Sequence, residues 1–206
     1  MSWIEQISRY HPCNDQERKD KELILNCIDM FGDVLTRRNG LAHLTSSALA
    51  VNSARTKALM VHHNIYHSWS WTGGHADGET DLLAVALREL AEETGVRKVH
   101  PVFADIFSLD VLPVLGHVKN GQYVPAHLHL SVAFLVEADE NQPLVVNREE
   151  NSGVRWIPLE EMAACSTEPH MQNLYRKLVS KIPRHSQAFP DGSVPTEEEN
   201  ISGDRP

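Results

Sequence analysis

Residues 73–96 read GGHADGETDLLAVALRELAEETGV. A helix over 81–94 is predicted, because apolar residues recur at helical spacing and would form one buried stripe. That stripe comprises Leu83, Ala86, Leu87, Leu90 and Thr94. The glycine pair before the helix is expected to break a preceding strand and to allow a tight turn.

Three glutamates gather on another side of the same predicted helix. Glu89, Glu92 and Glu93 lie at positions i, i+3 and i+4, so their carboxylates are neighbours. Like charges this close lower stability unless water or a cation offsets them, and a hard divalent cation with oxygen ligands offsets them best. The pattern therefore indicates a metal site, to which a carbonyl of the glycine pair can add a ligand. A glutamate-rich face that is only solvated is the alternative.

The stretch resembles the Nudix box, a pattern of glycine, five residues, glutamate, seven residues and Arg-Glu-aliphatic-x-Glu-Glu-x-Gly-aliphatic. With Gly74 as the first glycine, seven further positions fall in register: Arg88, Glu89, Leu90, Glu92, Glu93, Gly95 and Val96. One position departs from the pattern, because Thr80, between Glu79 and Asp81, replaces the early glutamate. In the family that glutamate pairs with the arginine, and Asp81 is the acid expected to replace it.

The resemblance implies an activity and a cofactor. Nudix enzymes hydrolyse a nucleoside diphosphate linked to another moiety, with water attacking phosphorus and Mg²⁺ or Mn²⁺ as cofactor. The resemblance therefore predicts a small-molecule diphosphate substrate, whose identity stays unassigned, as for a bacterial-type stand-alone member of about this length.

The resemblance also assigns roles to single residues. Glu92, Glu93 and the carbonyl of Gly73 are the expected metal ligands, and Glu89 is either a ligand or the base. Arg88 is expected to support them. Outside the box, Glu150 is the other candidate base, although an acidic pair in a loop is ordinary.

Histidines and a tryptophan are candidates for substrate binding. His127 and His129 are two residues apart on a predicted strand and so point to one face, while His75 lies in the box. Such histidines bind metal or, when protonated, contact phosphate; an ordinary surface pair is the alternative. Trp71 either stacks on a base or packs in the core.

Two other functions remain open beside the hydrolase. A Nudix domain that binds a nucleotide or a regulator without turnover is favoured by Thr80, but the arginine and glutamates of the box are intact. Isopentenyl-diphosphate isomerases share the architecture and use histidine ligands, and Gly74-His75 echoes part of their pattern. They need a cysteine at the position of Gly73, so this activity is the less favoured.

Outward from the box, the pattern predicts an α+β, mixed α/β protein. Strands are expected over 43–51, 57–62, 66–72, 102–112, 114–118, 123–136 and 154–157, with a hairpin turn at Asn120-Gly121. Helices are expected over 15–31, from 158 onward and over 171–182. The resemblance, which extends over about 40–182, implies an α/β/α sandwich with a mixed sheet and an added N-terminal helix.

Three regions are expected along the chain. Residues 1–39 form a helical extension, with Asn14 and Glu17 as a capping box, which either covers the pocket or builds a homodimer interface. Residues 40–185 form the Nudix domain. Residues 186–206 are acidic and poor in apolar side chains, so a disordered tail is expected.

Composition narrows the partners. The 206 residues carry a net charge of −9, which disfavours a nucleic acid polymer but allows a phosphorylated small molecule bridged by a cation. The longest apolar run, 82–87, is too short to cross a membrane. Three widely spaced cysteines and a first segment without a secretory pattern predict a reduced, cytoplasmic setting.

Overall fold

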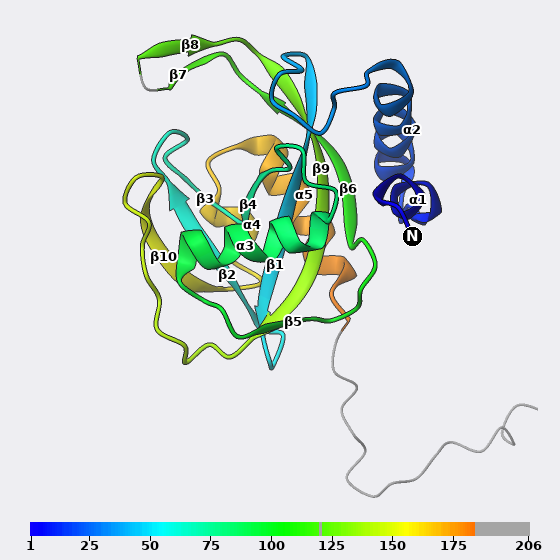
Figure 1. Cartoon of the computed structure of the whole chain (residues 1–206). Helices are drawn as coiled ribbons and strands as arrows, with labels where there is room; N and C mark the ends of the chain where they lie inside the picture. The colour runs from blue at the N-terminus through cyan, green and yellow to red at the C-terminus, as the bar shows by residue number, and fades with distance from the viewer. Residues whose placement is uncertain (120, 184–206) are drawn as a thin grey trace, which may run out of the picture.

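The strand β1 (Ala42–Asn52) is buried along its whole length and lies at the centre of a mixed sheet (Figure 1). In this computed structural model, which describes residues 1–119 and 121–183, β1 pairs in parallel with β9 (His127–Ala138). It pairs antiparallel with β2 (Lys57–His63) and β4 (Thr72–His75). The other strands are β3 (Ser68–Ser70), β5 (Val99–Pro101), β6 (Ser108–Val114) and β10 (Asn151–Pro158), paired with β2 or β9.

Helices cover both faces of this sheet (Figure 1). The helix α3 (Leu82–Thr94) packs with even-numbered side chains of β1 and β9, which include Leu44 and Phe134. The helices α4 (Met162–Cys165) and α5 (Pro169–Lys181) pack with odd-numbered side chains such as Leu49. This alternation is the one that a strand buried on both faces requires, and it confirms the predicted α/β/α sandwich with a mixed sheet.

The N-terminal extension packs beside β6 through α1 (Trp3–Arg9) and α2 (Asp15–Met30) (Figure 1). Ile7 and Ile24 are fully buried and belong to the same core as α3. Asn14 caps α2 by accepting a hydrogen bond from the Glu17 amide at 2.8 Å. The predicted capping box does not form, because the Glu17 carboxylate points into the protein instead of back to the cap.

The buried Glu17 carboxylate joins α2 to α5 and β6. Its oxygens contact the Nζ atoms of Lys181 and Lys177 at 2.6 and 3.0 Å. They also accept hydrogen bonds from the Tyr10 hydroxyl, the Cys13 amide and the Ser108 hydroxyl. The extension is therefore part of the folded body, held by apolar packing and by this ionic cluster.

Two predicted strands have different bounds in the structure. The strand expected over 66–72 is divided into β3 and β4, which pair with different neighbours, and Gly73 and Gly74 lie within β4 instead of ending a strand. The strand expected over 102–112 is replaced by β5, which ends at Pro101, and β6, which begins at Ser108. Strand partners decide these breaks, and the local alternation does not encode them.

The stripe predicted on α3 is also shifted. Leu82 and Val85 are buried, whereas Leu83 and Leu87 are only partly buried. The run over 82–87 is apolar on every side of the helix, so the pattern alone fits several neighbouring stripes.

The predicted hairpin is confirmed in outline. The strands β7 (His117–Lys119) and β8 (Gln122–Val124) pair antiparallel, and Gly121 in their turn has φ of +77°. The strand β9 begins only at His127, not at 123. Asn120 and the tail over 186–206 lie outside the described residues.

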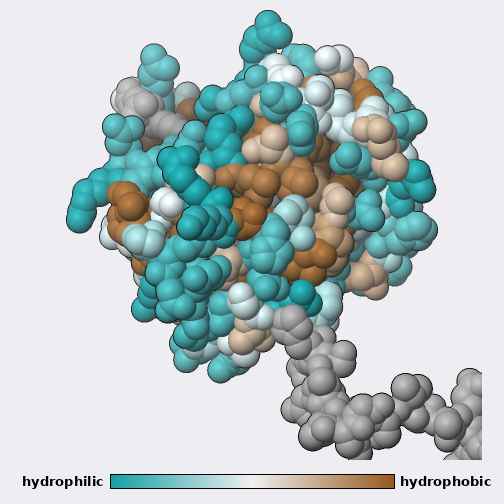
Figure 2. Space-filling view, turned by 60° about the horizontal axis from the view of Figure 1, so that its bottom comes forward, coloured by the Kyte–Doolittle hydropathy of each residue, from teal (hydrophilic) through white to brown (hydrophobic). Residues whose placement is uncertain are grey.

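The surface is mixed in character. On the face shown in Figure 2, apolar side chains gather in a band that hydrophilic side chains frame. The β7–β8 hairpin and the residues beside it expose Leu115 and Tyr123. Within the described ranges, none of the helices has the length and apolar character that a bilayer crossing needs.

Candidate active site

A cavity of about 540 Å³ opens where β1, β4 and β9 meet. Odd-numbered residues of two strands line it, among them His43, Thr45, His129 and Ser131. Further along the same sheet face, odd-numbered residues such as Leu49 belong to the apolar core beside α5. One face of the sheet therefore has a polar end, which lines the cavity, and an apolar end, which packs in the hydrophobic core.

Carboxylates form one wall of this cavity. Glu89 and Glu93 reach it from α3, and Glu150 reaches it from the loop before β10. Glu92 is exposed on the same helix and acts electrostatically on both box glutamates. Three of the four acids that the sequence singled out thus line the cavity and Glu92 lies beside them on α3, while Glu149, the neighbour of Glu150 in the acidic pair, does not line it.

Glu93 is the most buried of these acids, with an exposed fraction of 7%. Among the described residues, its buried Oε2 atom has no hydrogen-bond partner. Burial, reinforced by the charges of Glu150 and Glu89, raises the pKa of the Glu93 carboxyl to about 9, against a smaller lowering by the Gly73 amide. An unpartnered buried oxygen among like charges fits a divalent cation, since hard dications prefer oxygen ligands.

Glu89 is partly held by its neighbour in sequence. Burial raises the pKa of the Glu89 carboxyl, and the Arg88 guanidinium, whose Nη2 lies 3.2 Å from Oε1, opposes that rise. The Arg88 side chain is half exposed. Its contact with Glu89 agrees with the supporting role expected from the box.

The glycine pair lets β4 pass between β1 and α3. A Cβ atom on Gly74 would collide with the Glu89 carboxyl group, and one on Gly73 would lie 2.9 Å from the carbonyl oxygen of Ser46. Real Cβ atoms do not approach neighbours so closely, so a side chain at Gly73 would require the backbone of β1 to shift and one at Gly74 would displace the Glu89 carboxyl group. These glycines therefore serve close packing at the site, and the expected tight turn after a broken strand is wrong.

The expectation for Asp81 is also wrong. Its carboxylate is the N-cap of α3 and accepts a hydrogen bond from the Ala84 amide at 3.0 Å. Glu79 accepts hydrogen bonds from the amides of Thr80 and Asp81, which lower the pKa of its carboxyl. Within the described part of the chain, the acid that Arg88 contacts is Glu89.

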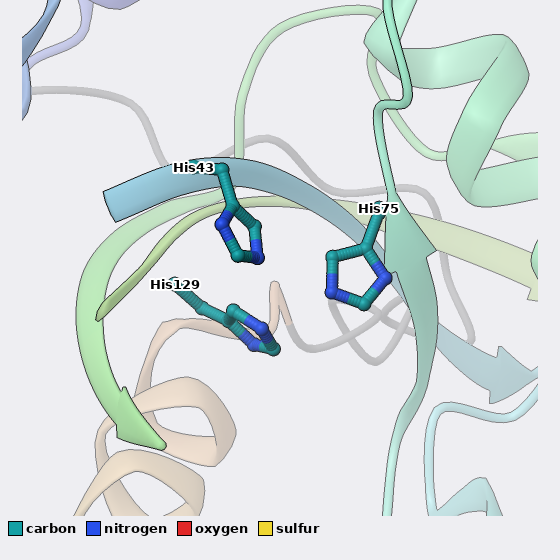
Figure 3. A group of neighbouring side chains, drawn as sticks. All are labelled: His43, His75 and His129. Carbon is teal, nitrogen blue, oxygen red and sulfur yellow. The ribbon is translucent and has the colours of Figure 1, made fainter. Parts of the chain in front are cut away.

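Histidines form the opposite end of the cavity. The rings of His75, His127 and His129, which the sequence singled out, lie around His43, with centroids 4.8–5.2 Å from its ring (Figure 3 draws three of the four). Burial and then the charges of neighbouring histidines lower the pKa of His129 to about 2. Burial likewise lowers the pKa of His43, although its hydrogen bond to Asn39 opposes this. His129 is therefore neutral at working pH.

Sequence reasoning missed His43 and a rim contact. A signal for His43 existed, because Leu44 separates His43 from Thr45 just as leucines separate His127, His129 and Ser131. At the rim, Arg37 and Asp77 form a bidentate ion pair at 2.8 and 2.6 Å. No local pattern links these two, since they come from the extension and the box.

Trp71 lines the cavity but is mainly a core residue. Its exposed fraction is 7%, and its ring meets that of Tyr175 edge-on at 6.3 Å. The Trp71 amide donates to the Tyr175 hydroxyl at 3.2 Å. Only an edge of the indole is available to a bound molecule.

Comparisons with known proteins give one family. The family model described as NUDIX domain matches residues 42–178. An RNA pyrophosphohydrolase of Bartonella bacilliformis is 31% identical over 124 residues, which cover 55% of this chain and 71% of that protein.

Solved structures agree in fold. An Ap4A hydrolase of C. elegans in a binary complex superposes with a TM-score of 0.50 at 18% identity, covering 66% of this chain and 95% of that one. The E. coli dihydroneopterin triphosphate pyrophosphohydrolase gives 0.51 at 13% identity, covering 68% and 96%. At such identities the likeness concerns the fold alone.

Proposed function

The chain belongs to the NUDIX domain family, and from that membership we propose its chemistry: it is a pyrophosphohydrolase that cleaves a diphosphate linkage in a nucleoside diphosphate joined to another moiety. The observation that carries the proposal is the wall of carboxylates around the unpartnered Oε2 of Glu93. A polyanionic substrate binds beside these carboxylates only when cations bridge its phosphates and the carboxylates.

The cation is Mg²⁺ or Mn²⁺. Glu93, Glu92 and Glu89, with the carbonyl of Gly73, are the groups that would hold it, and all of them offer oxygen, as these ions prefer. A divalent cation bound there neutralises phosphate oxygens and acidifies water. The raised pKa values of Glu93 and Glu89 support this assignment, because a cation offsets the repulsion that raises them.

Glu150 is proposed as the base that accepts the proton of the attacking water. It lines the cavity on the same wall as Glu89 and Glu93 and is close enough to raise the pKa of both. Glu89 is less suited to this role, because Arg88 contacts its carboxylate at 3.2 Å and favours the ligand role. Arg88 is thus a positioning residue.

The histidine end of the cavity is proposed to bind the part of the substrate away from the carboxylates. His75, His127 and His129 line this end, together with the edge of Trp71. Neutral imidazoles donate or accept single hydrogen bonds and do not repel an anion. The cavity therefore offers a metal end for the diphosphate and a histidine end for the remaining group.

A product-release assay tests the proposal. The relatives are named for RNA, Ap4A and dihydroneopterin triphosphate, so the panel contains a 5′-triphosphorylated RNA, Ap4A, dihydroneopterin triphosphate, a nucleoside triphosphate and a nucleotide sugar. We expect phosphate or nucleotide release from at least one compound with Mg²⁺ or Mn²⁺, and none with a chelator. Metal binding without product from any compound would instead support a non-catalytic nucleotide-binding domain.

The setting and assembly of the protein stay predictions. Cys13, Cys27 and Cys165 are free thiols, as a reduced compartment such as the cytoplasm requires. Residues 1–39 contribute Arg37 to the cavity rim, which supports the prediction that the extension shapes the pocket. A homodimer is the other role predicted for the extension, and sedimentation analysis of the full chain would test it.

A further inference from the structure

Three strands bring three histidines to one point. His43 lies directly opposite His129 in the parallel β1–β9 pair, and His75 lies opposite Thr45 in the antiparallel β1–β4 pair. One ring nitrogen of each histidine lies within 4.8 Å of one ring nitrogen of the other two. Figure 3 shows the three rings, from three different strands, facing a common space. The sheet backbone thus fixes the spacing of the three rings.

The tautomer of His43 is set by a backbone carbonyl. Its Nδ1 lies 2.9 Å from the carbonyl oxygen of Asn39, and a carbonyl can only accept, so Nδ1 carries the proton. The lone pair of His43 is therefore on Nε2. That atom is buried and has no hydrogen-bond partner within the described part of the chain. A buried acceptor without a partner is costly, and a bound cation would supply the missing partner.

The tautomer of His129 follows from a similar chain of contacts. Nδ1 of His127 donates to the carbonyl oxygen of Pro125 at 2.9 Å, so Nε2 of His127 is an acceptor. Nε2 of His129 lies 3.3 Å from it and donates. The lone pair of His129 is then on Nδ1. Hydrogen bonds that fix ring orientation and tautomer in this way are typical of metal-binding histidines.

We propose that His43, His75 and His129 bind a transition-metal dication, with Zn²⁺ as the best fit, at a site separate from the carboxylates of α3. Three imidazole nitrogens suit zinc and its neighbours, whereas Mg²⁺ prefers oxygen. A point shared by three atoms at most 4.8 Å apart lies at most about 2.8 Å from each. Zinc–nitrogen bonds are about 2.0–2.1 Å, so ring shifts under about 1 Å close the site.

The site leaves room for a further ligand. Zinc with three protein ligands takes a fourth from solution, and the three histidines line the cavity. The proposal goes beyond the hydrolase activity, whose proposed base and Mg²⁺ or Mn²⁺ ligands all lie at the carboxylate end. It places a second, softer cation at the histidine end of the same cavity.

Cobalt provides the test, because four-coordinate Co²⁺ replaces zinc and absorbs visible light strongly. The full chain, purified without a histidine tag, is titrated with Co²⁺ in excess Mg²⁺, which occupies the oxygen ligands. We expect one equivalent of Co²⁺ to give strong visible absorption. His43→Ala and His129→Ala should weaken this binding at least about tenfold, since each removes a ligand. His100→Ala, at an exposed histidine of β5, is the matched control and should bind like the wild type.

Two further measurements keep the test independent of folding and of hydrolysis. X-ray absorption of the wild-type zinc complex should show three imidazoles, and a sphere of oxygen alone overturns the proposal. Unchanged cobalt spectra in folded His43→Ala and His129→Ala overturn it as well. Glu93→Gln should keep the cobalt site while losing turnover, so failure of the metal site and failure of the proposed hydrolase are distinguishable.

Discussion

At the scale of single residues, the site depends on how closely the β4 backbone approaches its neighbours. Gly73 and Gly74 allow the β4 backbone to lie against β1 and against the Glu89 side chain, and Glu93 is buried behind them. The spacing of the box predicted which acids gather here. It did not predict the part played by the glycines, because close packing depends on the strand that lies alongside, far away in sequence.

Glu93→Gln removes the carboxylate that a cation would bind but keeps the shape of the side chain. We expect turnover to fall about 100-fold or more, because a metal ligand contributes several kcal/mol to transition-state stabilisation. The metal-free melting temperature should stay within about 3 °C of the wild type, since a carboxyl with a pKa of about 9 is already uncharged at neutral pH and the amide keeps its shape. Calorimetry with and without Mg²⁺ gives the control, because only the wild type should gain stability from the ion. Undiminished turnover would contradict the metal assignment.

Gly73→Ala and Gly74→Ala should fail in different ways. The added methyl at Gly73 meets the backbone of Ser46, so we expect a loss of about 1–3 kcal/mol in the free energy of unfolding. At Gly74 it meets the flexible Glu89 side chain, so turnover should fall more than stability. Gly32→Ala is the control, because its methyl meets no described atom within 4 Å. Denaturant unfolding and turnover, measured together, separate the effects; equal losses at both positions count against this account.

Glu150→Gln tests the proposed base against an adjacent acid. Glu150 lines the cavity, whereas Glu149, the next residue, does not. We expect kcat of Glu150→Gln to fall about 10²–10⁴-fold with KM little changed, as for the loss of a general base. Glu149→Gln should match the wild type. Equal rates for both variants would leave Glu89 as the base.

At the scale of elements, the bounds of α3 and β1 were predicted to within one residue, because the residues that begin and end these elements are local signals. They failed where a strand changes partner, as between β3 and β4, since pairing over a long sequence separation leaves no local mark. For the same reason the sequence did not reveal that His43 belongs to the site, since its position opposite His129 depends on the parallel register of β1 and β9. In α2, Asn14 was read correctly as the cap, but Glu17 instead holds the helix to α5.

The ion pairs and hydrogen bonds of the buried Glu17 carboxylate make the free energy of unfolding depend on pH. Burial alone would raise the pKa of Glu17, but the Cys13 amide, Lys181 and Tyr10 together lower it from 4.5 to about 2. Because the folded pKa is the lower one, the stabilisation is complete above pH 4.5 and is lost as the pH falls towards 2. That shift corresponds to about 3 kcal/mol.

We therefore expect the free energy of unfolding of the wild type to fall more steeply between pH 4.5 and 2 than that of Glu17→Gln. At pH 7 the variant should be destabilised by about 3–5 kcal/mol, because Lys181 and Lys177 lose their buried partner. Urea unfolding at each pH measures both effects. Glu22→Gln, at an exposed acid of the same helix, is the control. Parallel pH profiles for wild type and Glu17→Gln would rule out this role.

At the scale of the whole molecule, the folded body includes residues that lie before the start of the matched family domain. The family match begins at residue 42, yet Ile7 and Ile24 of the extension are fully buried in the core that α3 shares. The sequence alone predicted an accessory helix and could not show this, because burial depends on what the rest of the chain leaves uncovered.

Truncation from each end tests these boundaries. Removing residues 1–39 should abolish folding, because burial of Ile7 and Ile24 contributes about 1.5–3 kcal/mol each and the Glu17 cluster is lost as well. Removing 186–206 should leave the melting temperature within about 2 °C, as expected for a stretch poor in apolar residues. Circular dichroism and limited proteolysis report both results. A stable chain without 1–39 would show that the extension is dispensable.

The parallel pairing of β1 with β9 has a consequence for the order in which the protein folds. The strands are about 85 residues apart in the chain, so their contact closes a long loop, and such contacts form slowly. The glutamate helix can form from local contacts early, but the hollow beside it cannot exist until residue 138 has joined the sheet. We therefore expect Glu89 and Glu93 to be placed on their helix before the cavity that they line has closed.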